Sequence, residues 1–243
     1  MIPIPSGRLA TALNLDRREL LALVGGGGKS TLLFQLAQTM NRRTIVTTTT
    51  KMGEHQTGNL DVIEAPFEQP LASWNGSSPV FVRSGVKGHK SIGVPPSVCD
   101  EWFSDDSLCD FVLVEADGAR HRPFKAPANF EPVLPVQTTT VLSVIGADAL
   151  GRVIADQCHR PLRVAAVAGC SPYERLTPAR AATVLSSPHG SFKGCAADAR
   201  KVVVITKVPL QEEDQTTFHL VEELVDALTP SHEVVLIEFE QVK

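Results

Sequence analysis

The sequence has few of the features that mark secreted, membrane-spanning or metal-stapled proteins. Its 243 residues contain five cysteines, an odd number without any CxxC pair. This count and spacing argue against a disulfide framework and a thiolate zinc site, so reduced thiols are expected. No apolar run approaches the roughly 18 residues that span a bilayer. The first 20 residues lack a continuous apolar core, so we expect no signal peptide and a cytoplasmic protein without a membrane partner.

Positive charge is also in short supply. The chain has 23 lysines and arginines against 27 acidic residues, a net charge of -4 and a pI near 6.0. This balance argues against a nucleic-acid partner held by bulk electrostatics. The isolated histidines, His159 among them, lack the HxxxH spacing of a metal site. With 43% hydrophobic and 21% charged residues, the composition is that of an ordinary globular domain.

Apolar runs that alternate with helical patterns indicate the fold class. Strands are expected at Leu20–Val24, Arg43–Thr49, Pro79–Arg83, Phe111–Glu115, Thr138–Ile145, Lys201–Thr206 and Glu233–Glu238. Helices are expected at Lys29–Met40, Pro161–Ala168, Pro178–Ser186 and Gln215–Leu228. This alternation predicts an α/β domain with a mostly parallel sheet and helices on both faces. We expect one domain over residues 1–243, with an insertion around 53–110 in which residues 84–97 form a loop.

A glycine-rich segment between the first strand and the first helix carries the strongest functional signal. It reads GGGGKST and comprises Gly25, Gly26, Gly27, Gly28, Lys29, Ser30 and Thr31. Successive glycine N–H groups and a helix N-terminus bind phosphate. Lys29 would reach the β- and γ-phosphates, and Ser30 would ligate Mg²⁺. Leu23 replaces the first glycine of GxxxxGK[ST], which leaves a shorter GxxGKST cradle. A plain glycine turn is the alternative, but it has no need of GKST, so the fold is predicted to be P-loop NTPase-like.

Threonines crowd the end of the second strand. Thr49 and Thr50 could ligate Mg²⁺ or hold a γ-phosphate, and Lys51 could neutralise phosphate charge. The β propensity of threonine explains the same run without any function. The functional interpretation therefore depends on the neighbouring phosphate loop.

The strand FVLVE ends in an acid, as a Walker B strand does. Glu115 and Asp117 share one face of that strand and could bind Mg²⁺ or orient an attacking water. Gly118 permits close backbone approach. An acidic turn after a buried strand is the alternative.

A basic run follows these acids. Arg120, Arg122 and Lys125 could stabilise charge during phosphoryl transfer or bind an anionic substrate. A solvated basic loop explains the run equally well.

The last strand motif bears on the nucleotide base. In GTP-binding proteins a buried strand is followed by [NT]KxD, whose aspartate reads guanine. This chain has Thr206 and Lys207, but Pro209 replaces the aspartate. Lys207 can still stack along a base, so ATP and GTP both remain open.

Five segments occur together in an order that resembles a known family. They are GGGGKST, VTTTTKM, VEADGARHRPFKAPANFEPVLP, IGADALG and HRP, and they are densest between Ala22 and Pro161. The sequence resembles the YqeC-like proteins, accessory proteins of selenium-dependent molybdenum hydroxylases. This resemblance implies a cytoplasmic P-loop protein that serves maturation of a molybdenum hydroxylase. It also implies that six residues lie near the nucleotide: Glu115, Asp117, Gly118, Arg120, Lys125 and Arg160.

Three functions fit these patterns. The first is a Mg²⁺-dependent NTPase, acting on ATP or GTP, that serves metalloenzyme maturation. The second is a kinase or ligase whose small anionic acceptor is held by Arg120, Arg122, Lys125 and Arg160. The third is a binding module, such as a cofactor carrier, in which the nucleotide only sets a conformation.

Overall fold

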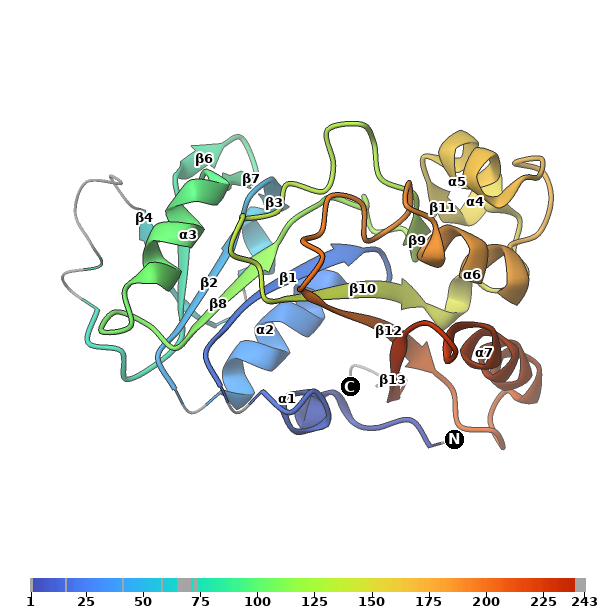
Figure 1. The fold of residues 1–243 in the computed structure, drawn as a ribbon, viewed down its shortest axis with the longest axis horizontal. Coiled ribbons are helices and arrows are strands. Elements are labelled where there is room, and N and C mark those ends of the chain that lie inside the picture. Colours follow the sequence, from blue (N-terminus) through green and yellow to red (C-terminus); the bar gives the residue numbers. More distant parts are fainter. Residues whose placement is uncertain are drawn as a thin grey trace.

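An eight-stranded parallel sheet forms the centre of the chain. The computed structural model describes residues 2–15, 17–40, 42–57, 59–64, 71 and 74–238. Its sheet runs in the order β13-β12-β10-β1-β8-β2-β5-β4, and each neighbouring pair is parallel (Figure 1). The strands are β1 (Glu19–Gly25), β2 (Thr44–Thr48), β4 (Asp61–Glu64), β5 (Val80–Arg83), β8 (Phe111–Glu115), β10 (Thr140–Gly146), β12 (Arg200–Val208) and β13 (Glu233–Glu238).

Helices cover both faces of this sheet because its central strands are apolar on both sides. On one face, α1 (Leu9–Ala12) and α2 (Lys29–Thr39) pack against Val202 and Val204 of β12 and equivalent positions of its neighbours. On the other face, α3 (Pro96–Ser104), α6 (Pro178–Ser186) and α7 (Gln215–Leu228) complete the core. The predicted α/β fold with helices on both faces is therefore confirmed.

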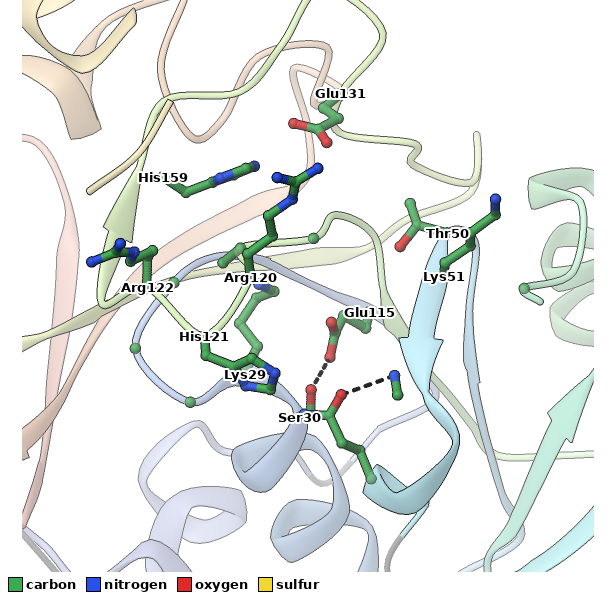
Figure 2. Close-up of a pocket in the computed structure, with 18 of the residues that line it drawn as sticks. Lys29, Ser30, Thr50, Lys51, Glu115, Arg120, His121, Arg122, Glu131 and His159 are labelled. Carbon is green, nitrogen blue, oxygen red and sulfur yellow. Dashed lines mark hydrogen bonds between the residues drawn. The ribbon is translucent and has the colours of Figure 1, made fainter. Parts of the chain in front are cut away.

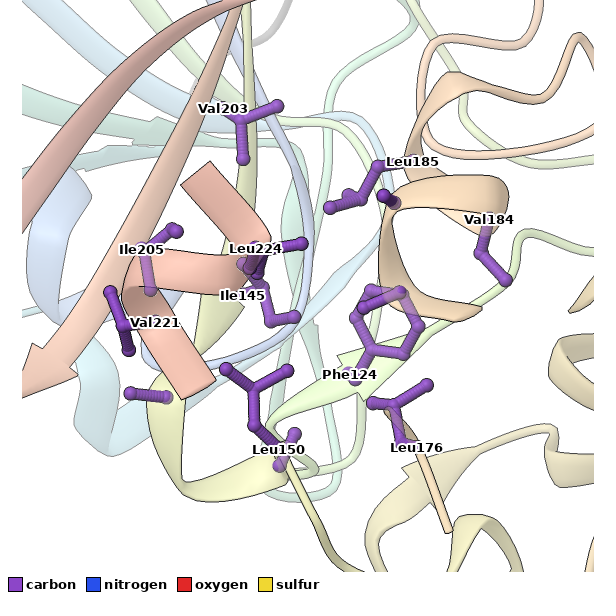
Figure 3. Packing of buried hydrophobic residues seen from close by; sticks show 14 of the residues in the cluster. Phe124, Ile145, Leu150, Leu176, Val184, Leu185, Val203, Ile205, Val221 and Leu224 are labelled. Atoms are coloured by element: carbon purple, nitrogen blue, oxygen red, sulfur yellow. The ribbon is translucent and has the colours of Figure 1, made fainter. Parts of the chain in front are cut away.

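One of the two cores on that second face shows why the strand alternation matters. Val203 and Ile205 of β12 meet Val221 and Leu224 of α7 in a cluster that also contains Ile145 of β10 (Figure 3). Successive residues of a strand point to opposite faces, so β12 serves two separate cores with one run of branched side chains.

Two smaller sheets lie beyond the carboxyl ends of the main strands. The first is antiparallel and consists of β3 (Lys51–Gly53), β7 (Lys90–Ile92) and β6 (Gly85–Lys87). The second pairs β9 (Phe124–Lys125) with β11 (Cys158–His159), next to α4 (Ile154–Gln157) and α5 (Pro161–Ala168). Figure 1 shows the two sheets on the same side of the main sheet, at its upper left and upper right. Short 3-10 turns occupy Ser6–Arg8, Glu54–Gln56 and Ala147–Ala149.

The expectation of a loop over residues 84–97 is wrong. This segment forms the hairpin of β6 and β7 and then the start of α3, whose first residue is Pro96. The hairpin turns at Gly88, which has a φ of 61°, and buries only Ser91 fully along β7. A strand that buries one small polar side chain shows no apolar alternation, so its sequence resembles a loop.

Two further expectations concern the cysteines and the possibility of membrane-spanning helices. The five cysteines, Cys99, Cys109, Cys158, Cys170 and Cys195, are all free, as expected. Within the described residues, none of the helices combines the length and apolarity that a membrane crossing requires. Residues 53–110 contribute β4 and β5 to the main sheet as well as the hairpin, and their status as an insertion stays a prediction.

Candidate functional site

The strand ends of the main sheet surround one large cavity. Its volume is about 830 Å³, and its floor is the loop that joins β1 to α2 (Figure 2). In parallel α/β sheets ligands bind beyond the carboxyl ends of the strands. The residues predicted from strand ends therefore converge here through topology.

The loop itself has the conformation of a phosphate cradle. Gly25, Gly27 and Gly28 have φ values of 96°, 75° and 96°, a left-handed region that favours glycine. A Cβ on Gly27 would lie 2.2 Å from the backbone nitrogen of Gly146, so no other residue fits there. Helix α2 begins at Lys29, directly after the glycines, and directs its N-terminal partial charge at the cavity.

Lys29 is buried and tied to the loop. Its Nζ donates a 2.6 Å hydrogen bond to the carbonyl of Gly25 and lies 3.2 Å from Oδ1 of Asp117. Both partners of Lys29 belong to the loop or support it, since Asp117 itself accepts the N–H of Gly25. A triphosphate that offered several anionic oxygens would compete for the same ammonium group.

Ser30 and Glu115 form the pair that a magnesium ion would need. The Ser30 hydroxyl donates a 2.6 Å hydrogen bond to Oε2 of Glu115. Mg²⁺ prefers octahedral oxygen ligands at about 2.1 Å, which places neighbouring ligands about 3 Å apart. The two oxygens are thus close to that spacing already. The residues present fit Mg²⁺, which ordinarily takes one or two protein ligands together with phosphate oxygens and water.

The ionisation of Glu115 favours the same interpretation. Burial raises its pKa, while the positive charge of Lys29 and the hydrogen bond from Ser30 act in the opposite direction. A carboxylate that is costly to keep ionised without a counter-ion gains most from a divalent cation beside it.

Asp117 lies beneath the loop and does not line the cavity. Its two oxygens each accept the N–H of Gly25 at 3.1 Å, and Oδ2 lies 3.0 Å from Nζ of Lys125. Lys125 is buried as well, and its Nζ also lies 2.8 Å from Oε2 of Glu131. Glu131 then pairs with Arg160 at 3.1 Å. A chain of charges therefore connects the underside of the cradle to the upper wall of the cavity.

The end of β2 is held against β8. Thr48 donates from its hydroxyl to the carbonyl of Glu115 at 2.8 Å, and Thr49 donates to the carbonyl of Val133 at 2.7 Å. Thr50 lies 3.3 Å from Thr48, hydroxyl to hydroxyl. Lys51, the first residue of β3, is exposed and lines the cavity. Thr49, Thr50 and Lys51 thus all line the cavity, and Figure 2 shows Thr50 and Lys51 on one side of it.

The opposite wall is basic and unusual in its backbone. Arg120, His121, Arg160 and Lys207 all line the cavity and all have a positive φ, between 50° and 60°. Such a conformation costs a non-glycine residue roughly 1–2 kcal/mol. Among the described non-glycine residues, just one other, Asn14, shares it. Four of the five described non-glycine residues with a positive φ therefore line this one cavity. Such clustering of strained backbone is typical of a functional site.

His159 is the neutral member of this wall. Burial lowers its pKa to about 4, and the positive charges of Lys125 and Arg160 contribute to the fall. The imidazole is therefore uncharged at neutral pH, and the cations around it favour this uncharged form. Lys207, which also lines the cavity, pairs with Asp148 at 2.6 Å, with both side chains partly exposed.

The structure brings most of the predicted site residues to the cavity. Those that line it are Gly26, Gly27, Gly28, Lys29, Ser30, Thr31, Thr49, Thr50, Lys51, Glu115, Arg120, Arg122, Arg160 and Lys207. Gly25, Asp117 and Lys125 lie behind them. Sequence reasoning missed Lys90, which fell in the segment expected to be a loop, and Phe130 and Glu131, which follow the basic run without a recognisable motif.

Two comparisons with known sequences identify one family. The model of the YqeC protein family matches residues 21–162. The chain is 32% identical over 198 residues to the YqeC protein of Escherichia coli (strain K12), covering 79% of this chain and 77% of that protein. Among solved structures, it is similar to the hydrogenase maturation factor HypB from Archaeoglobus fulgidus, with a TM-score of 0.40 and 12% identity, covering 96% of this chain and 87% of that one.

Proposed function

The chain belongs to the YqeC protein family, and we propose that it is a Mg²⁺-dependent nucleoside triphosphatase. The nucleotide is ATP or GTP. The proposal extends to an accessory role in the maturation of a selenium-dependent molybdenum hydroxylase, which rests on the sequence resemblance alone. The geometry of the phosphate site supports the triphosphatase activity, and that support does not depend on the accessory role.

The observation that carries the enzymatic proposal is the hydrogen bond between Ser30 and Glu115 at the mouth of the glycine loop. A hydroxyl at a helix start and a carboxylate at a neighbouring strand end meet at 2.6 Å. When bound there, Mg²⁺ would neutralise charge on the phosphates. A plain glycine turn has no need of a buried acid placed against the first residues of its helix.

The other residues supply binding and positioning. The loop N–H groups and Lys29 hold the phosphate chain, while Thr49 and Thr50 close the cradle from β2. Arg120 is placed to meet negative charge that accumulates on the terminal phosphate. Phosphoryl transfer needs mainly positioning and charge neutralisation, and this arrangement offers both.

The experiment is calorimetric titration with ATP and GTP, with and without Mg²⁺, and a phosphate-release assay on the same preparation. We expect Mg²⁺-dependent binding of one nucleotide with slow release. Lys29→Ala should weaken affinity about 100-fold, because it removes a charge-assisted contact to two phosphates. Lys87→Ala is the control, since Lys87 is an exposed lysine outside the cavity.

The outcomes separate the competing functions. If Lys29→Ala leaves affinity and turnover unchanged, the proposal is wrong. A phosphorylated or ligated product in place of free phosphate would identify a kinase or ligase. A retained nucleotide without turnover, together with nucleotide-dependent capture of a hydroxylase, would identify a binding module.

A further inference from the structure

We propose that the cavity binds a second ligand beside the triphosphate, a small oxyanion such as a phosphate group, between Arg120 and the β3–β7 strands. This inference rests on the proposed function, because it places the second anion next to the terminal phosphate of a nucleotide held in the glycine loop. It names the chemical class of a second substrate for that site.

The charge of the cavity exceeds what one nucleotide needs. The described lining residues include seven lysines and arginines and two carboxylates, and Lys125, Asp117 and Asp148 lie in contact with them, which leaves a formal excess of four positive charges in a chain whose net charge is -4. A triphosphate with its Mg²⁺ carries a formal charge of about -2. The remaining positive charge favours a further anion in the same cavity.

The small antiparallel sheet presents one face to this space. Lys51 and Gly53 of β3, together with Lys90 and Ile92 of β7, line the cavity. They are cross-strand partners, since Lys51 pairs with Ile92 and Gly53 pairs with Lys90. The residues between them, Met52 and Ser91, are buried on the other face. This alternation fixes both lysines on the cavity side.

Three cations of the cavity have no partner among the described residues. The side chains of Lys51, Lys90 and Arg120 make no ion pair or hydrogen bond with the part of the chain that the structure describes. The other lining cations are engaged. Lys29 pairs with Asp117, Arg160 with Glu131 and Lys207 with Asp148, while Arg122 donates to the carbonyl of Asp156.

The positions of the unpaired cations define the site. Figure 2 shows Arg120 and Lys51 on opposite sides of the space above Ser30 and Glu115. That space continues from the end of the cradle where the metal and the terminal phosphate would lie. Arg120 also has a φ of 50°, and this strained backbone conformation accompanies the placement of its side chain over this space.

The test uses the full chain with a non-hydrolysable triphosphate analogue and Mg²⁺, so that the cradle is filled. Inorganic phosphate is then titrated into the loaded protein by calorimetry. We expect one phosphate site per chain. Lys90→Gln should weaken phosphate binding by about 10-fold or more, the loss expected for a charge-assisted hydrogen bond, and more than it weakens binding of the analogue, whereas Arg120→Gln should weaken both, because Arg120 also faces the terminal phosphate.

Lys87→Gln is the matched control. Lys87 on β6 is the direct cross-strand partner of Lys90 and is equally a lysine of the small sheet, but it does not line the cavity. Because Lys87 lies beside Lys90 without lining the cavity, its replacement should weaken phosphate binding much less than Lys90→Gln does. If the loaded protein does not bind phosphate, or if Lys87→Gln weakens it as much as Lys90→Gln does, the second site is wrong and the nucleotide site still stands. If the analogue itself does not bind, the proposed function and this inference both fail.

Discussion

Lys125 connects the phosphate loop to the wall above it by contacting Asp117 and Glu131 at once. Its Nζ lies 3.0 Å from Asp117 and 2.8 Å from Glu131, and all three side chains are buried. Asp117 in turn accepts the N–H of Gly25 and pairs with Lys29. The conformation of the glycine loop is thus fixed by a buried charge network rather than by the glycines alone.

Asp117→Asn should therefore destabilise the fold strongly. The substitution leaves Lys29 and Lys125 with less compensation in a buried setting, and breaking such a pair costs about 3–5 kcal/mol. Urea unfolding measures this change. Asp148→Asn is the control, because the Asp148–Lys207 pair is partly exposed and should cost about 1 kcal/mol or less. Equal losses in the two variants would contradict a structural role for Asp117.

Two glycines with ordinary backbone angles test the packing around the loop. A Cβ on Gly26 would lie 2.5 Å from the carbonyl oxygen of Arg122 and 2.8 Å from the nitrogen of Phe124. Gly26→Ala should therefore cost about 1–3 kcal/mol, as overpacking against backbone does. Gly118→Ala should stay within about 0.5 kcal/mol, since nothing lies within 4 Å of its added Cβ. Thermal unfolding of both variants decides the matter.

The free energy of unfolding at acidic pH should depend on Glu131. Burial opposes its ionisation, but the hydrogen bond and charge of Lys125 and the contact with Arg160 prevail and lower its pKa to about 2 from an ordinary 4.5. A lowered carboxyl pKa stabilises the fold above pH 4.5, and this contribution is lost as the pH falls toward 2. In Glu131→Gln, the free energy of unfolding should vary less with pH in that window. An unchanged slope would refute the assignment.

His159 should titrate far below a free histidine, and bound nucleotide should reverse part of the shift. Its pKa of about 4 means that the unfolded chain, titrating near 6.5, takes up a proton first, so His159 lowers stability as the pH falls from 6.5 to 4. Added negative charge favours the imidazolium. NMR titration of the His159 ring, identified by its absence in His159→Gln, should show the pKa rising when Mg²⁺ and a triphosphate analogue bind. A pKa near 6.5 in the free protein would count against the buried geometry.

The regular parts of the fold were accessible from sequence because their signals are local. Continuous apolar runs predicted the strands of the main sheet from β1 to β13, apart from the edge strand β4. Three of four residues of β4 are exposed, so burial imposes no pattern on it. Proline at the helix start marked α5 and α6, whose bounds match the expected ones. The hairpin of β6 and β7 escaped because it buries almost nothing apolar.

The sequence by itself identified the glycine loop as a candidate phosphate site, since four glycines followed by Lys29 and Ser30 form one continuous segment whose chemistry depends on neighbours in the chain. It also indicated which strand ends carry the other polar groups. Only the tertiary structure decided how these groups divide. It placed Asp117 and Lys125 beneath the loop, Glu115 beside Ser30, and Lys90 in the lining of the same cavity as Arg120. The physical reason is that strand order and register set these long-range contacts, and neither is written in the local pattern of any segment.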